Sequence, residues 1–358
     1  MIDRAFWAGK RVLLTGHTGF KGGWMALWLQ DMGARVVGFS LAPPTDPNLF
    51  EVARVAEGMV SIIADIRDLA ALSAIMAEHR PEIVVHMAAQ PLVRHSYDEP
   101  IETLETNVIG TANVLEAVRR TGGVRAVVVV TSDKCYANRE WVWGYRENEA
   151  MGGYDPYSAS KGCAELVTDS YRQSFFNPAD WERHRVGVAS GRAGNVIGGG
   201  DWAKDRLMTD LIAALTAGRP AIIRNPLAVR PWQHVLEPVR GYLMLAEQLW
   251  HRAPEVADGW NFGPNEDSIK PVGWIADWLV AHWGRGARWE LDQGANPHEA
   301  RHLKLDCSKA KAGLGWEPAW SLEQALERIV SWTEALGRGD DMRAVCLRQI
   351  SDYLDDVH

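Results

Sequence analysis

The sequence contains few cysteines and no long hydrophobic run. Its four cysteines lie scattered along 358 residues without paired spacing, so we predict no disulfide framework, no zinc site and no other metal. No apolar run reaches the roughly 18 residues that span a bilayer, and residues 1–10 lack the core of a signal peptide. These absences lead us to expect a cytoplasmic protein without a membrane partner.

Positive charge is scarce as well. The chain has 38 Lys and Arg against 46 Asp and Glu, a net charge of -8, and no basic cluster stands out. Because the phosphates of a nucleic acid would be repelled, no nucleic-acid partner is expected. Hydrophobic residues make up 47% of the sequence, enough for a sizeable core in one large domain with a smaller one appended.

Short apolar runs alternate with helical patterns through the first half of the chain. Residues 11–15, 35–40, 83–88 and 126–131 have the length and composition of buried strands, and helix-like stretches separate them. This alternation predicts an α/β fold: a Rossmann-type, doubly wound parallel sheet with a smaller, mixed C-terminal substrate-binding part.

The regular alternation ends near residue 196, where glycine-rich and proline-rich pieces begin. A later apolar run looks like a return to the sheet, so the boundary between the two parts is expected to be discontinuous. The predicted division is a dinucleotide-binding domain over 1–193 with a return segment at about 227–265, and a substrate-binding part over 194–226 and 266–358.

The segment from Gly16 to Gly22 has the spacing G-x-x-G-x-x-G between the first predicted strand and the first helix. Glycines there allow a tight turn and let a pyrophosphate approach the start of the helix. Ser40 stands at the end of the second strand, where an acidic residue would bind the adenosine ribose, so the choice between NAD and NADP stays open. Asp65 is either an adenine contact or a solvated loop carboxylate.

Two pairs of side chains indicate chemistry beyond binding. Tyr157 and Lys161 lie four residues apart on one helix face, and an ammonium beside a phenol lowers the phenol pKa, which suits a redox base. Asp133 and Lys134 follow a strand directly, where ligand crevices form. An apolar site would make Asp133 an acid, and burial near other cations would make Lys134 a base. The alternative for Tyr157 and Lys161 is an ordinary amphipathic helix without a catalytic role. The alternative for Asp133 and Lys134 is a solvated pair in a loop.

In combination these motifs resemble the extended short-chain dehydrogenase/reductase family, over nearly the whole chain, and in particular its nucleotide-sugar dehydratases. The resemblance is carried by GHTGFKG at 16–22, AAQPLVR at 88–94, TSDKCY at 131–136, RAGNVIGGGDW at 192–202 and RPWQHV at 230–235. In most of these dehydratases glutamate follows the aspartate. Lys134 departs from that pattern and agrees with the branch that acts on CDP-glucose.

The resemblance implies a tightly bound NAD that is regenerated in each turnover, a nucleotide-sugar substrate, CDP-glucose, between the two parts, and a homodimer or dimer of dimers built by helix pairing. It also implies deoxysugar biosynthesis, as for lipopolysaccharide O-antigen. The implied catalytic residues are Thr131, Asp133, Lys134, Tyr157 and Lys161. The implied NAD contacts are Gly16, His17, Thr18, Gly19, Phe20, Lys21, Gly22, Ser40, Asp65, Ile66, Ala88, Ala89, Gln90, Asn107, Thr131, Tyr157 and Lys161. The implied substrate contacts are Gln90, Ser96, Ser132, Asn195, Arg206, Arg230 and Glu299.

Several alternatives remain at this stage. Arg206 is also compatible with an ordinary surface position, and Asn107 with a helix cap or kink. For the whole chain, the alternatives are a nucleotide-sugar 4-epimerase, a dehydratase of another nucleotide hexose, and an NAD-binding regulator without activity. Asp133 and Lys134 favour a dehydratase over an epimerase, and Tyr157 with Lys161 disfavours a regulator. The assignment of CDP depends on the resemblance alone.

Overall fold

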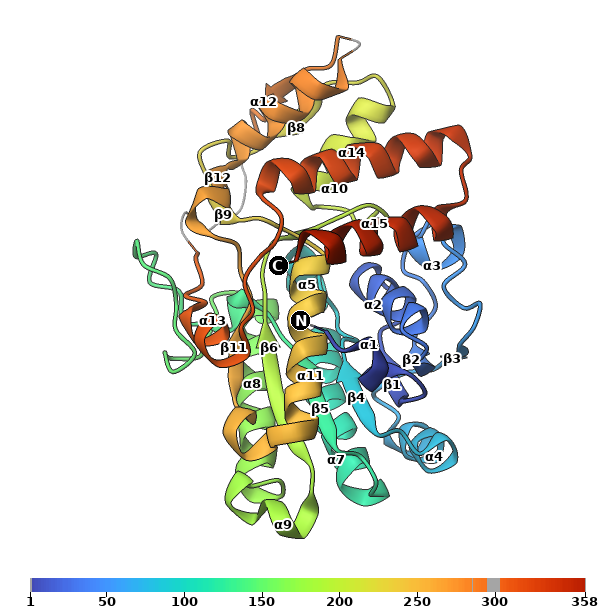
Figure 1. Cartoon of the computed structure of the whole chain (residues 1–358). Helices are drawn as coiled ribbons and strands as arrows, with labels where there is room; N and C mark the ends of the chain where they lie inside the picture. The colour runs from blue at the N-terminus through green and yellow to red at the C-terminus, as the bar shows by residue number, and fades with distance from the viewer. Residues whose placement is uncertain (1, 285, 295–302, 358) are drawn as a thin grey trace.

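A seven-stranded parallel sheet forms the centre of the protein (Figure 1). The computed structural model describes residues 2–284, 286–294 and 303–357. The strand order is β11-β6-β5-β4-β1-β2-β3. The strands are β1 (Arg11–Thr15), β2 (Arg35–Ser40), β3 (Val60–Ile63), β4 (Ile83–His86), β5 (Ala126–Val130), β6 (Gly187–Arg192) and β11 (Gly259–Asn261). The prediction of a doubly wound α/β fold is confirmed.

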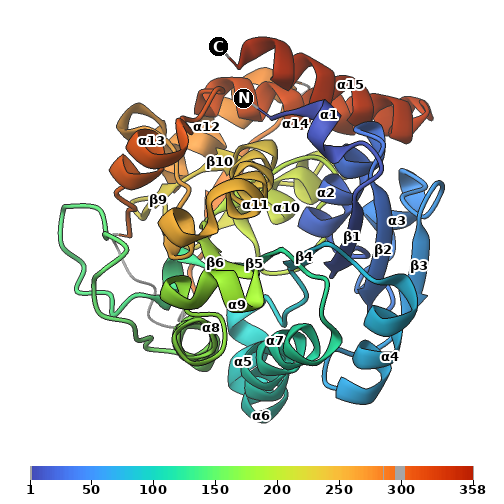
Figure 2. The same ribbon diagram turned by 60° about the horizontal axis from the view of Figure 1, so that its bottom comes forward.

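Helices cover both faces of this sheet, which explains why its strands are apolar almost throughout. Val12 and Leu14 of β1 belong to one buried cluster, whereas Leu13 between them belongs to another. Figure 2 shows α2 and α11 on one side of the sheet and α4, α7 and α8 on the other. These helices are α2 (Phe20–Asp31), α4 (Leu69–His79), α7 (Gly110–Thr121), α8 (Pro156–Ser174) and α11 (Leu236–Val256).

Short helical segments connect the main elements. A five-residue π-helical stretch, η1 (Glu105–Ile109), joins α6 (Pro100–Leu104) to α7 without a break. Such stretches are frequent at functional sites, and this one carries Asn107. The remaining segments are α1 (Arg4–Trp7), α3 (Leu49–Val52), α5 (Val93–Asp98), η2 (Asp133–Cys135), η3 (Pro178–Asp180) and α9 (Trp181–His184).

A smaller lobe with its own apolar cluster lies at the top of Figure 1. Its core packs between α10, α12 and α14, with three two-stranded pairings, β10-β7, β12-β9 and β13-β8. The elements of this half of the chain are β7 (Val196–Ile197), α10 (Leu207–Thr216), β8 (Ala221–Ile223), β9 (Val229–Pro231), β10 (Gln233–His234), η4 (Glu266–Ser268), β12 (Ile269–Pro271), α12 (Val272–Trp283), β13 (Trp289–Leu291), α13 (Ser308–Leu314) and α14 (Leu322–Arg338).

The last helix, α15 (Met342–Asp356), leaves this lobe and packs against α2 beside the central sheet. Tyr353 contacts the ring of Trp28 edge-on and donates a 2.5 Å hydrogen bond to the buried Glu237 of α11. The end of the chain therefore ties α2 to α11. Among the residues that the structure describes, no helix is long and apolar enough to cross a membrane.

Candidate active site

A cleft of about 1190 Å³ opens along the carboxyl edge of the central sheet. Turns that follow the parallel strands line it, as expected for an open α/β sheet. At the carboxyl ends of β1, β2, β4, β5 and β6 the cleft is lined by Gly16, Ser40, Met87, Thr131 and Ala193. The small lobe adds Arg206, Ile222 and Arg230. The cleft therefore joins the two parts of the chain.

The glycine turn at the start of α2 is shaped for close backbone approach. Gly16 has φ +79°, and a Cβ there would lie 2.7 Å from the amide nitrogen of Ala88. A Cβ on Gly22 would lie 2.0 Å from the carbonyl oxygen of Gly16. Gly19 caps α2 without a side-chain hydrogen bond, so the first N–H groups of the helix are left for an anion. This cradle fits the pyrophosphate of a dinucleotide.

The end of β2 carries no acid, as the sequence indicated. Ser40 instead shares a 2.8 Å hydrogen bond with Thr18, which also donates to the carbonyl of Leu41 at 2.8 Å. Asp65 lines the cleft, and hydrogen bonds from Arg67, one of them 2.6 Å long, hold the pKa of its carboxyl below the usual range. Asp65 is thus neither free nor simply solvated.

His17 of the glycine turn is fully buried and is not among the cleft residues. Its Nε2 lies 2.7 Å from the hydroxyl of Ser61, and its ring contacts Phe50 edge-on. Burial lowers its pKa to about 4, so the ring is neutral. Gly38 leaves the room for it, because a Cβ there would lie 2.3 Å from the ring. The side chain supports the turn from beneath.

The cleft brings Tyr157 and Lys161 together near the end of β5. Burial raises the pKa of Tyr157 to about 12, and a hydrogen bond with the hydroxyl of Ser132 opposes this rise. The direction is opposite to the lowering expected from the sequence, because the phenol is almost completely buried. Burial also lowers the pKa of Lys161 to about 8, while the charge of Glu165 opposes it.

The two neighbouring hydroxyls after β5 face different partners. Thr131, one of the catalytic residues that the resemblance implies, donates its hydroxyl to the buried carboxylate of Glu165. Ser132 is the hydroxyl that bonds Tyr157, and it also donates to Asp133 at 3.1 Å. The geometry therefore favours Ser132 over Thr131 as the hydroxyl beside the redox tyrosine.

Asp133 lies at the bottom of the cleft and is 1% exposed. Burial raises the pKa of its carboxyl, although the charge of Lys134 and the hydrogen bond from Ser132 oppose the rise. Its Oδ2 has no hydrogen-bond partner among the described residues. Gly194 makes space for this oxygen, since a Cβ there would lie 1.8 Å away. A neutral, proton-donating carboxyl suits this environment.

Lys134 lines the cleft next to Asp133 and is half-buried. The sequence analysis made a neutral amine there depend on burial and nearby cations, and the burial is only partial. Lys21 of α2 is a second cleft lysine, and burial lowers its pKa to about 8. The charges of Arg206 and Lys161 lower the pKa of Lys21 further, so positive charge gathers at this end of α2.

Three predicted contacts hold the cleft wall instead of lining it. Asn107 accepts a 2.8 Å hydrogen bond from the amide of Gln90 and donates one of 2.8 Å to Ser160. The side chain of Gln90 turns back to Leu92 and Thr103. Ser96 accepts a 3.1 Å hydrogen bond from the amide of Tyr157. Through Ser160 and Tyr157, Asn107 and Ser96 hold the start of α8 in place.

The candidate phosphate contacts come from the second half of the chain. Asn195 and Arg230 both line the cleft, and the charge of Arg230 lowers the pKa of Asp133. Arg206 is held by Asp201 at 2.7 Å, and its charge acts on Tyr157. Glu299 lies outside the described residues.

Glu165 is a residue that the sequence analysis did not single out. Its side chain is 5% exposed and contacts Thr131, Ser190 and Arg192. A spacing of four residues from Lys161 within one helix was the available signal, but a carboxylate at that spacing is equally common on a solvated helix face.

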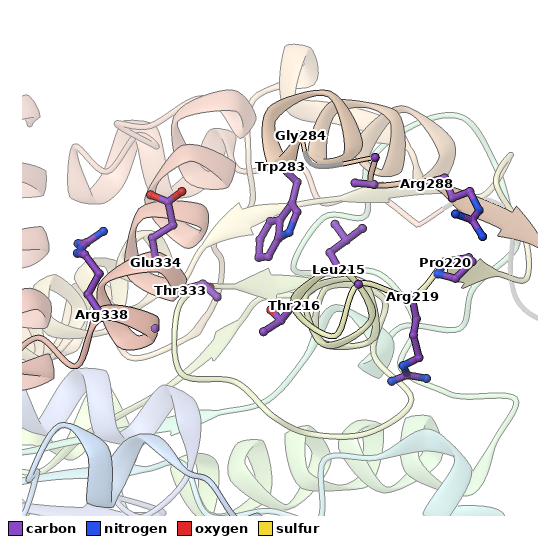
Figure 3. A pocket seen from close by; sticks show the side chains of 14 residues that line it. Leu215, Thr216, Arg219, Pro220, Trp283, Gly284, Arg288, Thr333, Glu334 and Arg338 are labelled. Atoms are coloured by element: carbon purple, nitrogen blue, oxygen red, sulfur yellow. The ribbon is translucent and has the colours of Figure 1, made fainter.

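A second hollow of about 520 Å³ lies in the small lobe, between the ends of α10, α12 and α14 (Figure 3). Arg288 and Arg338 at its rim pair with Glu290 and Asp340. None of the candidate catalytic residues lines this hollow. Within the described residues, moreover, no group of three or more His, Cys, Asp or Glu side chains is placed to hold a metal ion.

Comparisons with known proteins place this site in context. The family model described as GDP-mannose 4,6 dehydratase matches residues 13–329. The chain is 58% identical over 354 residues to CDP-glucose 4,6-dehydratase of Salmonella typhimurium, covering 99% of each protein. A structure of MoeE5 in complex with UDP-glucuronic acid and NAD is 26% identical, with a TM-score of 0.75 over 90% of this chain and 99% of that one. The dTDP-glucose 4,6-dehydratase of Bacillus anthracis in complex with NAD shares the fold, with a TM-score of 0.73, 21% identity and 91% and 97% coverage.

Proposed function

The chain belongs to the GDP-mannose 4,6 dehydratase family of extended short-chain dehydrogenases/reductases, and from that premise we propose that it dehydrates CDP-D-glucose. The product is CDP-4-dehydro-6-deoxy-D-glucose, and the enzyme is a hydro-lyase of deoxysugar biosynthesis. The observation that carries the proposal is the grouping of a buried, neutral-favouring Asp133 with Lys134 and Tyr157 in one cleft. An epimerase needs the tyrosine but has no use for an acid that expels water.

NAD is the cofactor. The fit is supported by the cradle at Gly16 and Gly22, which a Cβ would fill, and by the uncapped start of α2. Ser40, Asp65 and Ile66 line the adenosine end of the same cleft. When bound, NAD accepts the hydride from sugar C4 and later delivers it to C6. The choice of NAD over NADP agrees with the pairing of Arg67 with Asp65, because a guanidinium bound to a carboxylate is not available for a ribose 2′-phosphate.

Oxidation at C4 depends on Tyr157. We propose that Tyr157 removes the proton of the sugar 4-hydroxyl and that Ser132 forms a hydrogen bond with that hydroxyl oxygen. Burial opposes ionisation of the phenol, so the cation of Lys161 within the same cleft has to stabilise the phenolate. Thr131, in this account, positions Ser132 from the neighbouring site on the strand end.

Elimination of water uses Asp133 and Lys134. A C4 ketone acidifies the C5 proton, which Lys134 removes as the base. Asp133 donates its proton to the departing 6-hydroxyl, and its raised pKa keeps that proton available. Asn195, Arg206 and Arg230 are proposed to hold the diphosphate, because cationic and amide donors there leave the reacting carbons to the catalytic groups.

Isotope transfer tests this function directly. With CDP-glucose carrying deuterium at C4, we expect the deuterium at C6 of the product, no dependence on added reductant and no net accumulation of reduced cofactor. Mass spectrometry and NMR of the product measure its position. An epimerase would return deuterium to C4, and loss to solvent would rule out internal return. Parallel assays with dTDP-, GDP- and UDP-glucose test the nucleotide, and CDP-glucose is expected to have the highest kcat/KM.

We also propose that the enzyme is a homodimer through α6, η1 and α8. These elements pack together and leave apolar side chains exposed, notably Ile101, Ile109 and Leu166. Contiguous exposed apolar side chains on paired helices favour burial against a second copy. A dimer of dimers is the larger assembly that the family resemblance also allows.

Leu166→Glu should convert this dimer to monomer. Leu166 is 59% exposed in the single chain, and a carboxylate there would be buried without a partner in the proposed interface. Light scattering after gel filtration is expected to give about half the wild-type mass. Leu291→Glu, on β13 of the small lobe, is the control and should keep the wild-type mass. An unchanged mass for Leu166→Glu would place the interface elsewhere.

The remaining assignments stay predictions. They are the division into 1–193 with a return at about 227–265, against 194–226 and 266–358, and the individual cofactor and substrate contacts. A cytoplasmic location remains an expectation from the sequence features described above, and a role in O-antigen synthesis depends on the family resemblance alone.

A further inference from the structure

The buried carboxylate of Glu165 lies behind the candidate redox pair, outside the cleft. Glu165 follows Lys161 by one turn of α8, so the two side chains share a helix face. Nothing in the proposed reaction uses Glu165 as an acid, a base or a substrate contact. A carboxylate that is 5% exposed is nevertheless costly to keep unless its partners and its position serve a purpose.

Three donors from two strand ends satisfy this carboxylate. Thr131, directly after β5, donates to Oε1. Ser190 and Arg192 of β6 donate to Oε2, each at 2.7 Å. Burial favours the neutral acid, but the charge of Arg192 and these hydrogen bonds hold the pKa of Glu165 below its usual value. The carboxylate is therefore ionised.

The charges that face Lys161 come from several elements. Lys21 of α2 is a nearby cation, and His86 of β4 is neutral because burial lowers its pKa to about 3. Burial raises the pKa of the Cys135 thiol, so that group is neutral as well. Glu165 is thus the ionised carboxylate that counters both the burial of Lys161 and the neighbouring cation.

We propose that Glu165 is a positioning residue for C4 oxidation: its carboxylate keeps the Lys161 ammonium charged and fixes Thr131, so that Ser132 presents its hydroxyl to Tyr157. The proposal rests on the proposed function, because it requires Tyr157 and Lys161 to act as the redox pair. It links the ion pair with Arg192, beneath the sheet edge, to the chemistry in the cleft.

The sign of the pH effect follows from this arrangement. Lys161 stabilises the Tyr157 phenolate only while the lysine is protonated. This stabilisation is lost as the pH rises through the pKa of Lys161, which is about 8 in the wild type. Removing the charge of Glu165 lowers that pKa further. The alkaline limb of the pH profile must then move to lower pH.

Glu165→Gln removes the negative charge of the side chain while keeping its size and shape, and so tests the effect of that charge on Lys161. In single turnovers with NAD-loaded enzyme and CDP-glucose, the alkaline limb of C4 oxidation should move down by about one pH unit. At pH 8 the rate should fall by about fivefold, and well above pH 8 by about tenfold, with little change in KM. Glu165→Asp keeps the charge but shortens the side chain. The rate of C4 oxidation should fall because the hydrogen bond with Thr131 is lost, whereas the alkaline limb should stay at the wild-type pH.

Two further variants separate charge from stability. Glu237→Gln replaces another buried carboxyl group, one that holds α15 and lies outside the cleft, and should leave the pH profile unchanged. If Glu165→Gln does not fold, the double variant Glu165→Gln/Arg192→Gln removes both buried charges, which costs less stability than leaving one unpaired. It should show the same limb shift, because Glu165 is the charge that acts on Lys161.

Equal rate losses in Glu165→Gln and Glu165→Asp without a limb shift would overturn the proposal and leave Glu165 a structural residue. A limb shift in Glu237→Gln would overturn it too, since the effect would then be general. Failure of the wild type to turn over CDP-glucose would instead reject the proposed function, so the two failures are distinguishable.

Discussion

Replacing Tyr157 by phenylalanine should slow C4 oxidation of CDP-glucose by about 10²-fold or more, the usual scale for a positioned proton acceptor. The substitution keeps the ring that fills this buried position and removes the oxygen that Ser132 bonds. Lys161 then has no phenolate to stabilise. The rate of appearance of reduced cofactor in a single turnover, with enzyme in excess, measures the step.

Tyr171→Phe is the matched control, because Tyr171 lies in the same helix and its hydroxyl bonds Glu116 at 3.4 Å, away from the cleft. It should retain wild-type turnover. Near wild-type rates in Tyr157→Phe would remove Tyr157 from the mechanism. Equal losses in both variants would instead indicate general damage to α8.

The fold could be predicted because its signals are local. The strands β1, β2, β4 and β5 are short apolar runs, and β1 and β5 show why: their alternate residues enter two different cores, so no polar position interrupts them. The packing of α15 onto α2 was not predictable in this way, because it depends on a contact between Trp28 and Tyr353, more than 300 positions apart in the sequence.

The sequence does not show which of two neighbouring hydroxyls, Thr131 or Ser132, bonds Tyr157. Thr131 and Ser132 are adjacent hydroxyls, and successive residues of an extended chain point in opposite directions. Both residues line the cleft, and the sequence does not show which hydroxyl bonds Glu165 and which bonds Tyr157; that depends on where α8 places these two partners. The direction of the Tyr157 pKa shift has the same origin, because burial depends on the assembled cleft.

Supporting residues were harder to separate from contacts. Gln90, Ser96 and Asn107 lie in motifs that surround the site, yet their side chains bond to backbone and to Ser160 within the wall. A motif records that a residue matters near a ligand. It does not record whether the residue touches the ligand or holds its neighbour in place.

Lys134→Met should stop the reaction after C4 oxidation. Methionine keeps the length and apolar stem of the lysine but cannot accept the C5 proton, so elimination should slow by roughly 10² to 10⁴-fold. Reduced cofactor should then accumulate in a single turnover, and exchange of the C5 proton with solvent should slow in parallel. Lys204→Met, which removes another cleft cation, should raise KM at most and should not cause accumulation.

Asp133→Asn provides the complementary block. Asparagine fits the space beside Gly194 but has no proton to give to the departing 6-hydroxyl. Reduced cofactor should again accumulate, but here the C5 proton should continue to exchange, because Lys134 is intact. The two variants therefore separate the base from the acid by the same isotope measurement.

Normal C5 exchange and normal product release in Lys134→Met would transfer the base role to another group. Lys21 would be the first to test, because it lies in the same cleft and burial brings its pKa to about 8, which gives it a neutral fraction near neutral pH. Tyr157 would be the second, since its oxygen could accept the C5 proton once it has released the proton of the 4-hydroxyl to solvent. Lys134 would then act on Asp133 through its charge, which opposes the raised pKa of that acid. In that case Lys134→Met would make Asp133 a weaker acid without limiting turnover, and the reduced cofactor that a missing base leaves behind would not accumulate.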